Sequence, residues 1–123
     1  VVGVAVEMLN GVYSASKSYV IGFGHTLQRD LGDKGVRIQT VMPGATATEF
    51  WDVAGYAPQK ESASTMSAAD LVDAALAGLD AGERVTIPGL HEGERWTQWE
   101  ADRRALAPKF ANAVPAARYG LAR

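Results

Sequence analysis

Short β-rich runs alternate with longer helical stretches along the chain. The β-rich runs predict strands at residues 1–6, 36–42 and 84–87. Apolar residues at helical spacing predict helices over 12–31, between Ser67 and Ala81, and over 93–107. Parallel strands need a long crossover connection, which is usually a helix. The alternation therefore predicts an α/β fold, a parallel sheet of about three strands with covering helices.

The predicted sheet is small for the class of fold that it suggests. Each strand–helix–strand unit takes ~30 residues or more, and a doubly wound sheet that binds a dinucleotide has about six strands. The 123 residues are enough for about half of such a sheet. We therefore expect a single partial domain over residues 1–123, in which residues 91–123 form a C-terminal extension.

Composition excludes several classes of function. The net charge is −2, which argues against a general nucleic-acid binder. The chain has no cysteine, so disulfides and thiolate chemistry are excluded, and the two histidines, His25 and His91, are too far apart in sequence to suggest a metal site. No apolar stretch is long enough to predict a membrane span. We expect a cytoplasmic protein with no nucleic-acid or membrane partner and no metal.

A long segment, residues 45–66, follows the predicted strand 36–42 and shows no regular period. Loops above ~12–15 residues without secondary structure are uncommon and are usually functional. The segment predicts a lid. Its aromatic residues, Phe50, Trp51 and Tyr56, fit either the lining of a pocket or the packing of the lid.

The run Tyr13-Ser14-Ala15-Ser16-Lys17 carries the strongest chemical signal. Residues four apart share one face of a helix. A free tyrosine titrates near ~10, and a nearby ammonium stabilises its phenolate form. A proton-transfer catalyst works best when it titrates near the working pH. Tyr13 and Lys17 are thus a candidate acid/base pair, although the same spacing also occurs by chance on helix surfaces.

Two motifs in the right order strengthen that interpretation. After the Tyr13–Lys17 run come a helix, a strand over 36–42 and then Pro43-Gly44-Ala45-Thr46-Ala47-Thr48. Together these motifs resemble the short-chain dehydrogenase/reductase family, over roughly residues 1–90. The resemblance implies a Rossmann-like doubly wound parallel sheet, of which this chain would be the C-terminal part. It also implies an oxidoreductase that uses NAD or NADP to interconvert a small-molecule carbonyl and an alcohol.

The resemblance implies a role for each matched residue. Tyr13 would donate or accept the proton of the substrate. Lys17 would hydrogen-bond the nicotinamide ribose and stabilise the phenolate form of Tyr13. Pro43 and Gly44 would shape the turn beside the nicotinamide. Thr46 would contact the carboxamide of the cofactor through its backbone, and Thr48 would bind the carboxamide or a phosphate through its hydroxyl.

Two features of the family are absent from the sequence. No Gly-rich turn that could hold a pyrophosphate follows a strand, since Gly22 and Gly24 lie within a predicted helix. Residues 1–12 contain no serine that could orient the substrate oxygen. We therefore expect a C-terminal half of a homo-oligomeric enzyme that is inactive by itself. The alternative is a non-catalytic α/β remnant or an interaction module.

Other chemically capable side chains have plainer interpretations. The two serines of the Tyr13–Lys17 run fit helix packing, and Trp96 and Trp99 fit core anchors of the last helix or a wall of the substrate pocket. Polar or charged positions on a helix surface are expected for His25, Arg103 and Arg104.

Overall fold

The computed structural model describes residues 1–9, 11–55 and 62–121. It divides into two compact units, Val1–Leu90 and His91–Arg123. Each unit is described by itself below.

The first unit contains the predicted helices and three short additional ones. Its helices are η1 (Val6–Met8), α1 (Gly11–Leu31), η2 (Gly32–Lys34), α2 (Phe50–Val53) and α3 (Ala68–Asp80). Signals present in the sequence mark the start of α3 and the turn that follows α1. The Ser67 hydroxyl accepts a hydrogen bond from the Asp70 amide at 3.0 Å and so caps α3. Beyond η2 the chain turns at Gly35, whose positive φ of 76° suits glycine.

The strand predicted over residues 1–6 is wrong. Residues 2–4 form a turn in which the Val4 and Ala5 amides both donate to the Val1 carbonyl, and η1 follows. Gly3 lies so close to α1 that an added Cβ would be 2.8 Å from the Lys17 carbonyl carbon. An apolar run indicates that a segment packs against the rest of the protein. It does not indicate whether the backbone of that segment is a strand, a turn or a helix.

The central sheet pairs two strands far apart in sequence. Strand β1 (Thr40–Val41) lies parallel to β4 (Val85–Thr86), with Thr40 opposite Val85 and Val41 opposite Thr86. Side chains alternate between the faces of a sheet, so Thr40 and Thr86 point to opposite faces.

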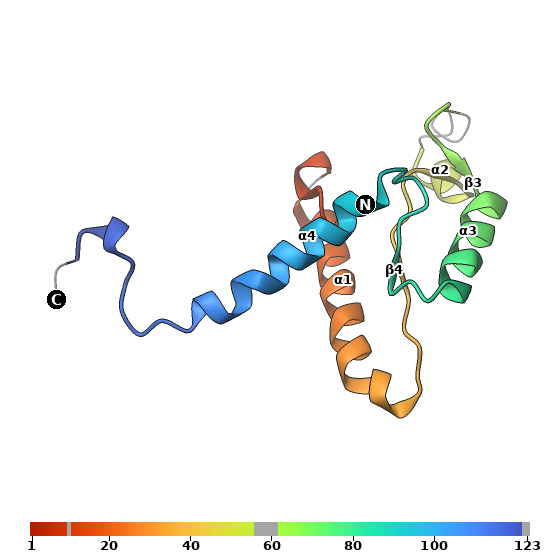
Figure 1. The fold of residues 1–123 in the computed structure, drawn as a ribbon. Coiled ribbons are helices and arrows are strands. Elements are labelled where there is room, and N and C mark those ends of the chain that lie inside the picture. The colour runs from red at the N-terminus through yellow and green to blue at the C-terminus, as the bar shows by residue number, and fades with distance from the viewer. Residues whose placement is uncertain (10, 56–61, 122–123) are drawn as a thin grey trace. The chain divides into compact units, whose positions relative to one another are not determined.

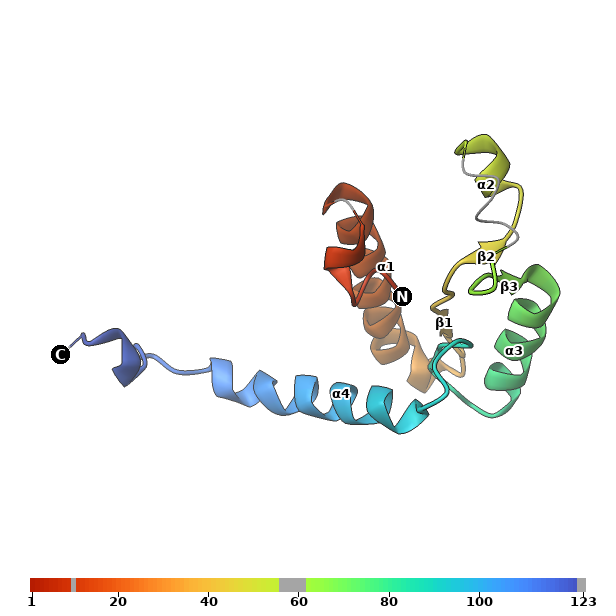
Figure 2. The same cartoon turned by 90° about the horizontal axis from the view of Figure 1, so that it is seen from above.

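Each threonine meets a glycine of a different helix. Gly24 of α1 packs against the Thr40 hydroxyl, and Gly78 of α3 packs against the Thr86 hydroxyl. The two helices therefore cover opposite faces of the sheet, and Figures 1 and 2 show the strands between them. A parallel sheet with helices on both faces is the expected α/β class, which is thereby confirmed.

The described parts of the segment 45–66, residues 45–55 and 62–66, contain more secondary structure than the sequence predicts. Strand β2 (Thr46–Ala47) pairs in parallel with β3 (Met66–Ser67), so both ends of the segment are joined. Helix α2 follows β2, and β3 leads directly into α3. The segment thus has a hydrogen-bonded base, at the start of the helix that covers one face of the main sheet.

Few large apolar side chains are buried in the described part of the chain. Met42, 4% exposed, is the only such residue that is fully buried, whereas Val12, Tyr19 and Phe23 on α1 are all about half exposed or more. Tyr19 and Phe23 stack on each other with ring centroids 6.0 Å apart. The described residues therefore leave much apolar surface uncovered.

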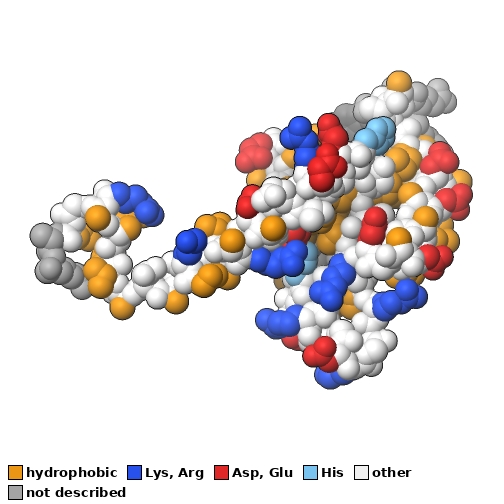
Figure 3. Space-filling view, in the orientation of Figure 1, with side chains coloured by type: hydrophobic (Ala, Val, Ile, Leu, Met, Phe, Trp, Pro, Cys, Tyr) orange, Lys and Arg blue, Asp and Glu red, His pale blue; other side chains and the backbone are white. Residues whose placement is uncertain are grey.

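The second unit consists of α4 (Gly93–Leu106) followed by η4 (Ala107–Phe110) and η5 (Ala117–Tyr119). Trp96 and Trp99 stack with centroids 4.7 Å apart, and Trp99 is 40% exposed. Glu100 forms salt bridges with Arg103 and Arg104, both of which are exposed as expected. Apolar side chains are also exposed along the segment after α4, where Figure 3 shows them in orange.

Candidate active site

The first turns of α1 lie at the same end of the first unit as the turn after β1. Helix α1 runs antiparallel to β1, because only residues 32–39 connect them and Gly24 packs on Thr40. From Gly24 back to Lys17 is about 10 Å along the helix, at ~1.5 Å per residue. From Thr40 forward to Pro43 is also about 10 Å, at ~3.3 Å per residue. Lys17 and Pro43 are therefore at similar heights above the sheet.

Residues 1–3 link these two regions. The Val1 backbone nitrogen donates to the Pro43 carbonyl at 2.9 Å. On the other side, the Ser18 hydroxyl donates to the Gly3 carbonyl at 2.7 Å. The second turn of α1 and the Pro43 turn thus border the same short segment. Ligands of open parallel sheets bind beyond the carboxyl ends of the strands, which is this end.

Tyr13 and Lys17 contact each other as their spacing predicts. The Lys17 ammonium lies over the Tyr13 ring, 5.0 Å from its centroid, in a cation–π arrangement. Tyr13 is 39% exposed, so its phenol can be reached from solvent. The pair thus places a cation over the ring of an exposed tyrosine.

The neighbouring serines use their hydroxyls on the backbone. Ser14 is 1% exposed and its hydroxyl faces the Leu9 carbonyl at 3.4 Å, while the Ser16 hydroxyl donates to the Tyr13 carbonyl at 2.6 Å. Both arrangements fit the expected packing role. Neither of these hydroxyls is arranged as a nucleophile beside a base.

The Pro43–Thr48 segment presents exposed groups at the carboxyl end of β1. Pro43, Gly44 and Thr48 are exposed, and Thr46 is half-buried. The Thr46 hydroxyl donates to the Gly44 carbonyl at 3.3 Å, and the Thr48 hydroxyl accepts from the Phe50 amide at 3.4 Å. These side chains stabilise the turn, and the backbone of the turn remains as a ligand surface.

The β2–β3 pairing determines which backbone groups face outward. The Met66 amide donates to the Ala45 carbonyl at 2.9 Å. Because neighbouring residues of a strand point their backbone groups to opposite edges, the N–H and C=O of Thr46 point away from β3. One donor and one acceptor on a single residue complement a primary carboxamide, the group that a nicotinamide carries. The carboxamide contact of Thr46 stays a prediction.

Trp51 is the contributor that the sequence did not specify. Its indole N–H donates to the Thr46 carbonyl at 2.6 Å, from the first turn of α2. A half-buried tryptophan usually finds a hydrogen-bond partner for its indole N–H, so the sequence could have indicated that Trp51 makes such a bond. It could not have indicated that the partner is the Thr46 carbonyl. Phe50 lies edge-on to Trp51 and is 55% exposed, and Tyr56 is outside the described residues.

The described residues contain neither a candidate metal site nor a candidate membrane span. No group of three or more histidine or acidic side chains among residues 1–9, 11–55 and 62–121 could hold a metal ion. Within the same ranges, no helix combines the length and apolarity needed to cross a membrane.

Comparison with known proteins agrees with the geometry. The family model for short chain dehydrogenases matches residues 1–57. The chain is 43% identical over 42 residues to a diacetyl reductase ((S)-acetoin forming) from Staphylococcus epidermidis. These 42 residues are 34% of this chain and 16% of that protein.

Two solved structures resemble nearly the whole chain. A short-chain dehydrogenase from Sphingobium yanoikuyae in complex with NADPH matches with a TM-score of 0.87 and 39% identity, over 97% of this chain and 46% of that one. A bulky-bulky ketone specific alcohol dehydrogenase from Comamonas testosteroni matches with a TM-score of 0.79 and 37% identity, over 97% of this chain and 43% of that one. The chain therefore has the Rossmann-like parallel α/β fold of these dehydrogenases and spans less than half of their length.

Proposed function

We propose that this chain is part of an NAD(P)-dependent oxidoreductase of the short-chain dehydrogenase family, which interconverts a carbonyl and an alcohol. The observation that carries the proposal is the contact between Tyr13 and Lys17 at the carboxyl end of the sheet, level with the Pro43 turn. The match of residues 1–57 to that family and the likeness to an NADPH-bound dehydrogenase support it.

Each residue of the site has a defined task in this proposal. The nicotinamide cofactor supplies or accepts a hydride. Tyr13 donates its phenolic proton to the carbonyl oxygen during reduction and takes it back during oxidation. Lys17, held on the Tyr13 ring, stabilises the phenolate between these steps and binds the ribose of the cofactor. Pro43 and Gly44 shape the turn, Thr46 binds the carboxamide through its backbone, and Thr48 adds a hydroxyl.

The substrate class is a small carbonyl compound or the matching alcohol. The relatives named above are a diacetyl reductase and a dehydrogenase of bulky ketones. An assay of the full-length protein with NADH and NADPH against diketones and bulky ketones tests the activity. Oxidation of neither cofactor with any of these compounds would leave the non-catalytic alternative as the better hypothesis.

The cofactor-binding half belongs to another part of the same protein. The chain corresponds to 46% of the NADPH-bound dehydrogenase. The main sheet in the described residues has two strands and Met42 as its one fully buried large apolar side chain, too little for an independent core. The DNA that encodes the protein tests this point: an open reading frame that also carries a strand, a Gly-rich turn and a helix would support it.

A binding measurement tests the same point on the chain itself. Residues 1–123 alone should bind NAD or NADP poorly, because the pyrophosphate lacks a Gly-rich turn and a helix N-terminus. If calorimetry gave a micromolar affinity of the isolated chain for NAD or NADP, the proposal that another part of the protein binds the pyrophosphate would be wrong.

The segment over residues 45–66 acts as a lid over cofactor and substrate. Its base is fixed by the β2–β3 pairing, and Phe50 is exposed on the helix that follows. Closure would exclude water from the reacting carbonyl. In the full-length protein, amide exchange across 45–66 should slow when cofactor and a substrate analogue are added. Equal protection with and without ligands would instead indicate a permanently packed loop.

The enzyme functions as a cytoplasmic homo-oligomer in this proposal. Val12, Tyr19 and Phe23 leave an exposed apolar stripe on α1, on the side away from Gly24 and the sheet. Light scattering of the full-length protein checks the assembly, and Phe23→Glu should shift it toward monomers.

A further inference from the structure

The strongest unexplained contact in the first unit joins the lid to the backbone of β2. The Trp51 indole N–H donates to the Thr46 carbonyl at 2.6 Å, across five residues of sequence. Trp51 is half-buried, whereas the neighbouring Phe50 and Val53 of the same short helix are exposed. The indole is thus the side chain of α2 that holds this helix against β2.

The contacted carbonyl belongs to the open edge of the strand. The β2–β3 ladder engages the backbone groups of Ala45 and Ala47, and it leaves those of Thr46 facing the other edge. A carbonyl oxygen has two lone pairs, so one indole N–H leaves room for a second donor. The Trp51 bond therefore fixes the direction of the Thr46 carbonyl without using up its capacity to accept.

The backbone around Trp51 makes this arrangement local and stiff. The Trp51 amide lies 3.4 Å from the Thr48 carbonyl, and the Thr48 hydroxyl accepts from the Phe50 amide. The chain from Thr46 to Trp51 thus closes on itself, with its ends joined by the indole.

We propose that Trp51 is a positioning residue for the nicotinamide end of the cofactor, because its indole orients the Thr46 carbonyl toward the carboxamide. This inference rests on the proposed function. It assigns to one side chain of the lid the coupling between lid position and cofactor binding. Trp51 acts through Thr46 and does not itself take part in proton or hydride transfer.

The test compares a complete cofactor with a truncated one in the full-length protein. Trp51→Phe removes the N–H and keeps an aromatic ring. We expect its affinity for NADH or NADPH to fall about five-fold, the ordinary worth of one hydrogen bond. Its affinity for ADP-ribose, or for the 2′-phosphate form if the protein prefers NADPH, should stay unchanged, because these probes lack the nicotinamide.

Val53→Ala is the matched control, since it alters an exposed side chain of the same short helix and leaves the indole bond in place. It should change neither affinity. The inference would be overturned if Trp51→Phe lost equal affinity for the complete and the truncated cofactor, or lost affinity for neither. A wild-type protein that binds neither NADH nor NADPH would instead overturn the proposed function.

A spectroscopic measurement on the wild type covers the case in which Trp51→Phe does not fold. The Trp51 indole ¹⁵N–¹H resonance is identified by sequential resonance assignment of the full-length protein. We expect this resonance to shift on addition of the complete cofactor and to stay in place with the truncated one. Identical responses to the two probes would count against the inference.

Discussion

The two ends of the β1–β4 sheet use their polar groups differently. At the amino end, long polar side chains are bonded to backbone carbonyls. The Gln28 amide donates to the carbonyls of Ile38 at 3.3 Å and Arg84 at 2.7 Å. The Arg37 guanidinium donates to the Leu79 carbonyl at 3.2 Å. At the carboxyl end, Tyr13 and Thr48 expose their side chains, and the turn presents its backbone.

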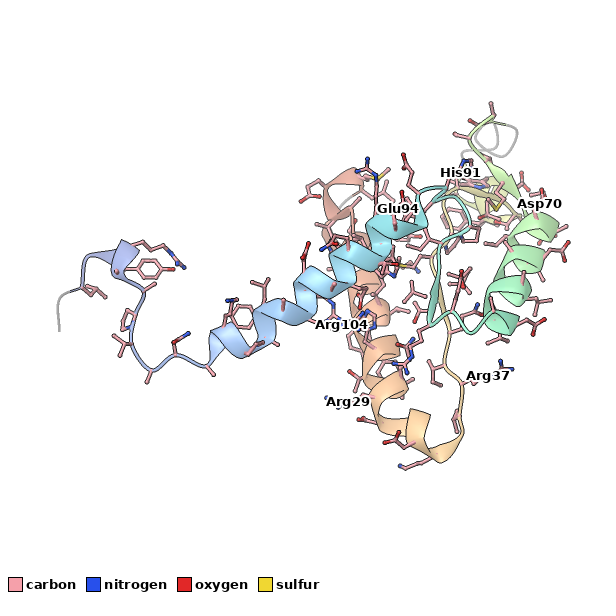
Figure 4. All side chains as sticks on the ribbon, viewed as in Figure 1. Arg29, Arg37, Asp70, His91, Glu94 and Arg104 are labelled. Carbon is pink, nitrogen blue, oxygen red and sulfur yellow. The ribbon has the colours of Figure 1, made fainter. Side chains whose placement is uncertain are left out.

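This difference shows that a pocket by itself does not identify the candidate active site. A pocket lined by Gln28, Arg37 and Arg84, among others, lies at the amino end, the end where Figure 4 shows Arg37, opposite to Asp70 at the start of α3. Its polar groups are engaged in holding the helices to the strands. The candidate catalytic residues Tyr13 and Lys17 lie at the other end, where ligands of open parallel sheets bind.

The comparison is tested most severely by Tyr13→Phe in the full-length protein. The substitution removes the phenolic proton and keeps the ring on which the Lys17 ammonium rests. General acid–base catalysis contributes ~10²–10⁴-fold, so turnover should fall by at least that factor. Cofactor affinity and melting temperature should change little. Retention of most of the activity would remove Tyr13 from the mechanism.

Lys17→Ala extends this test, because Lys17 is proposed to serve both the phenol and the ribose. Turnover and cofactor affinity should fall together, in contrast to Tyr13→Phe. Steady-state kinetics combined with a cofactor titration separate the two patterns. A Lys17→Ala protein with unchanged cofactor affinity would show that the ribose contact is wrong.

The opposite behaviour is expected at the amino end. Gln28→Leu leaves the Ile38 and Arg84 carbonyls without their side-chain donor. The Arg84 carbonyl keeps the Thr40 amide as a donor at 3.0 Å, so only the Ile38 carbonyl can lose its donor altogether. An unsatisfied, partly buried carbonyl costs roughly 1–3 kcal/mol, and the free energy of unfolding should fall by about that amount. Turnover of the folded fraction should stay the same. Denaturant unfolding and activity measured on one preparation distinguish this from a role in catalysis.

The sequence predicted the parts of the fold that local signals determine. Helices α1, α3 and α4 appear as expected. The signals that predict them, namely apolar spacing, the Ser67 cap and the glycine at 35, each depend on residues only a few positions apart in the sequence. The contact of Tyr13 with Lys17 follows equally from one helical turn.

Features that depend on distant partners were not predictable in the same way. The β2–β3 pairing joins Thr46 to Met66, and each strand has only two residues. Strands this short are too short for an alternating pattern of polar and apolar residues to reveal them. The Trp51 bond to Thr46 depends on how α2 folds back after β2. Residues 1–6 carry an apolar pattern that suits a strand, yet Gly3 packs closely on α1 and the chain turns there.

The smallest effect, and the one with the best internal control, comes from two glycines of α1. Gly24 packs on the Thr40 hydroxyl, whereas an added Cβ at Gly22 would meet no atom within 4 Å. Alanine is favoured over glycine within a helix by ~1 kcal/mol, so Gly22→Ala should raise the free energy of unfolding by about that amount. Gly24→Ala receives the same gain, but overpacking costs about 1–3 kcal/mol, and its net effect should be a loss of about 1 kcal/mol. Thermal unfolding of the two variants should therefore give shifts of opposite sign. Shifts of the same sign would mean that α1 does not pack on β1 through Gly24, and the arrangement of the helix over the sheet would need revision.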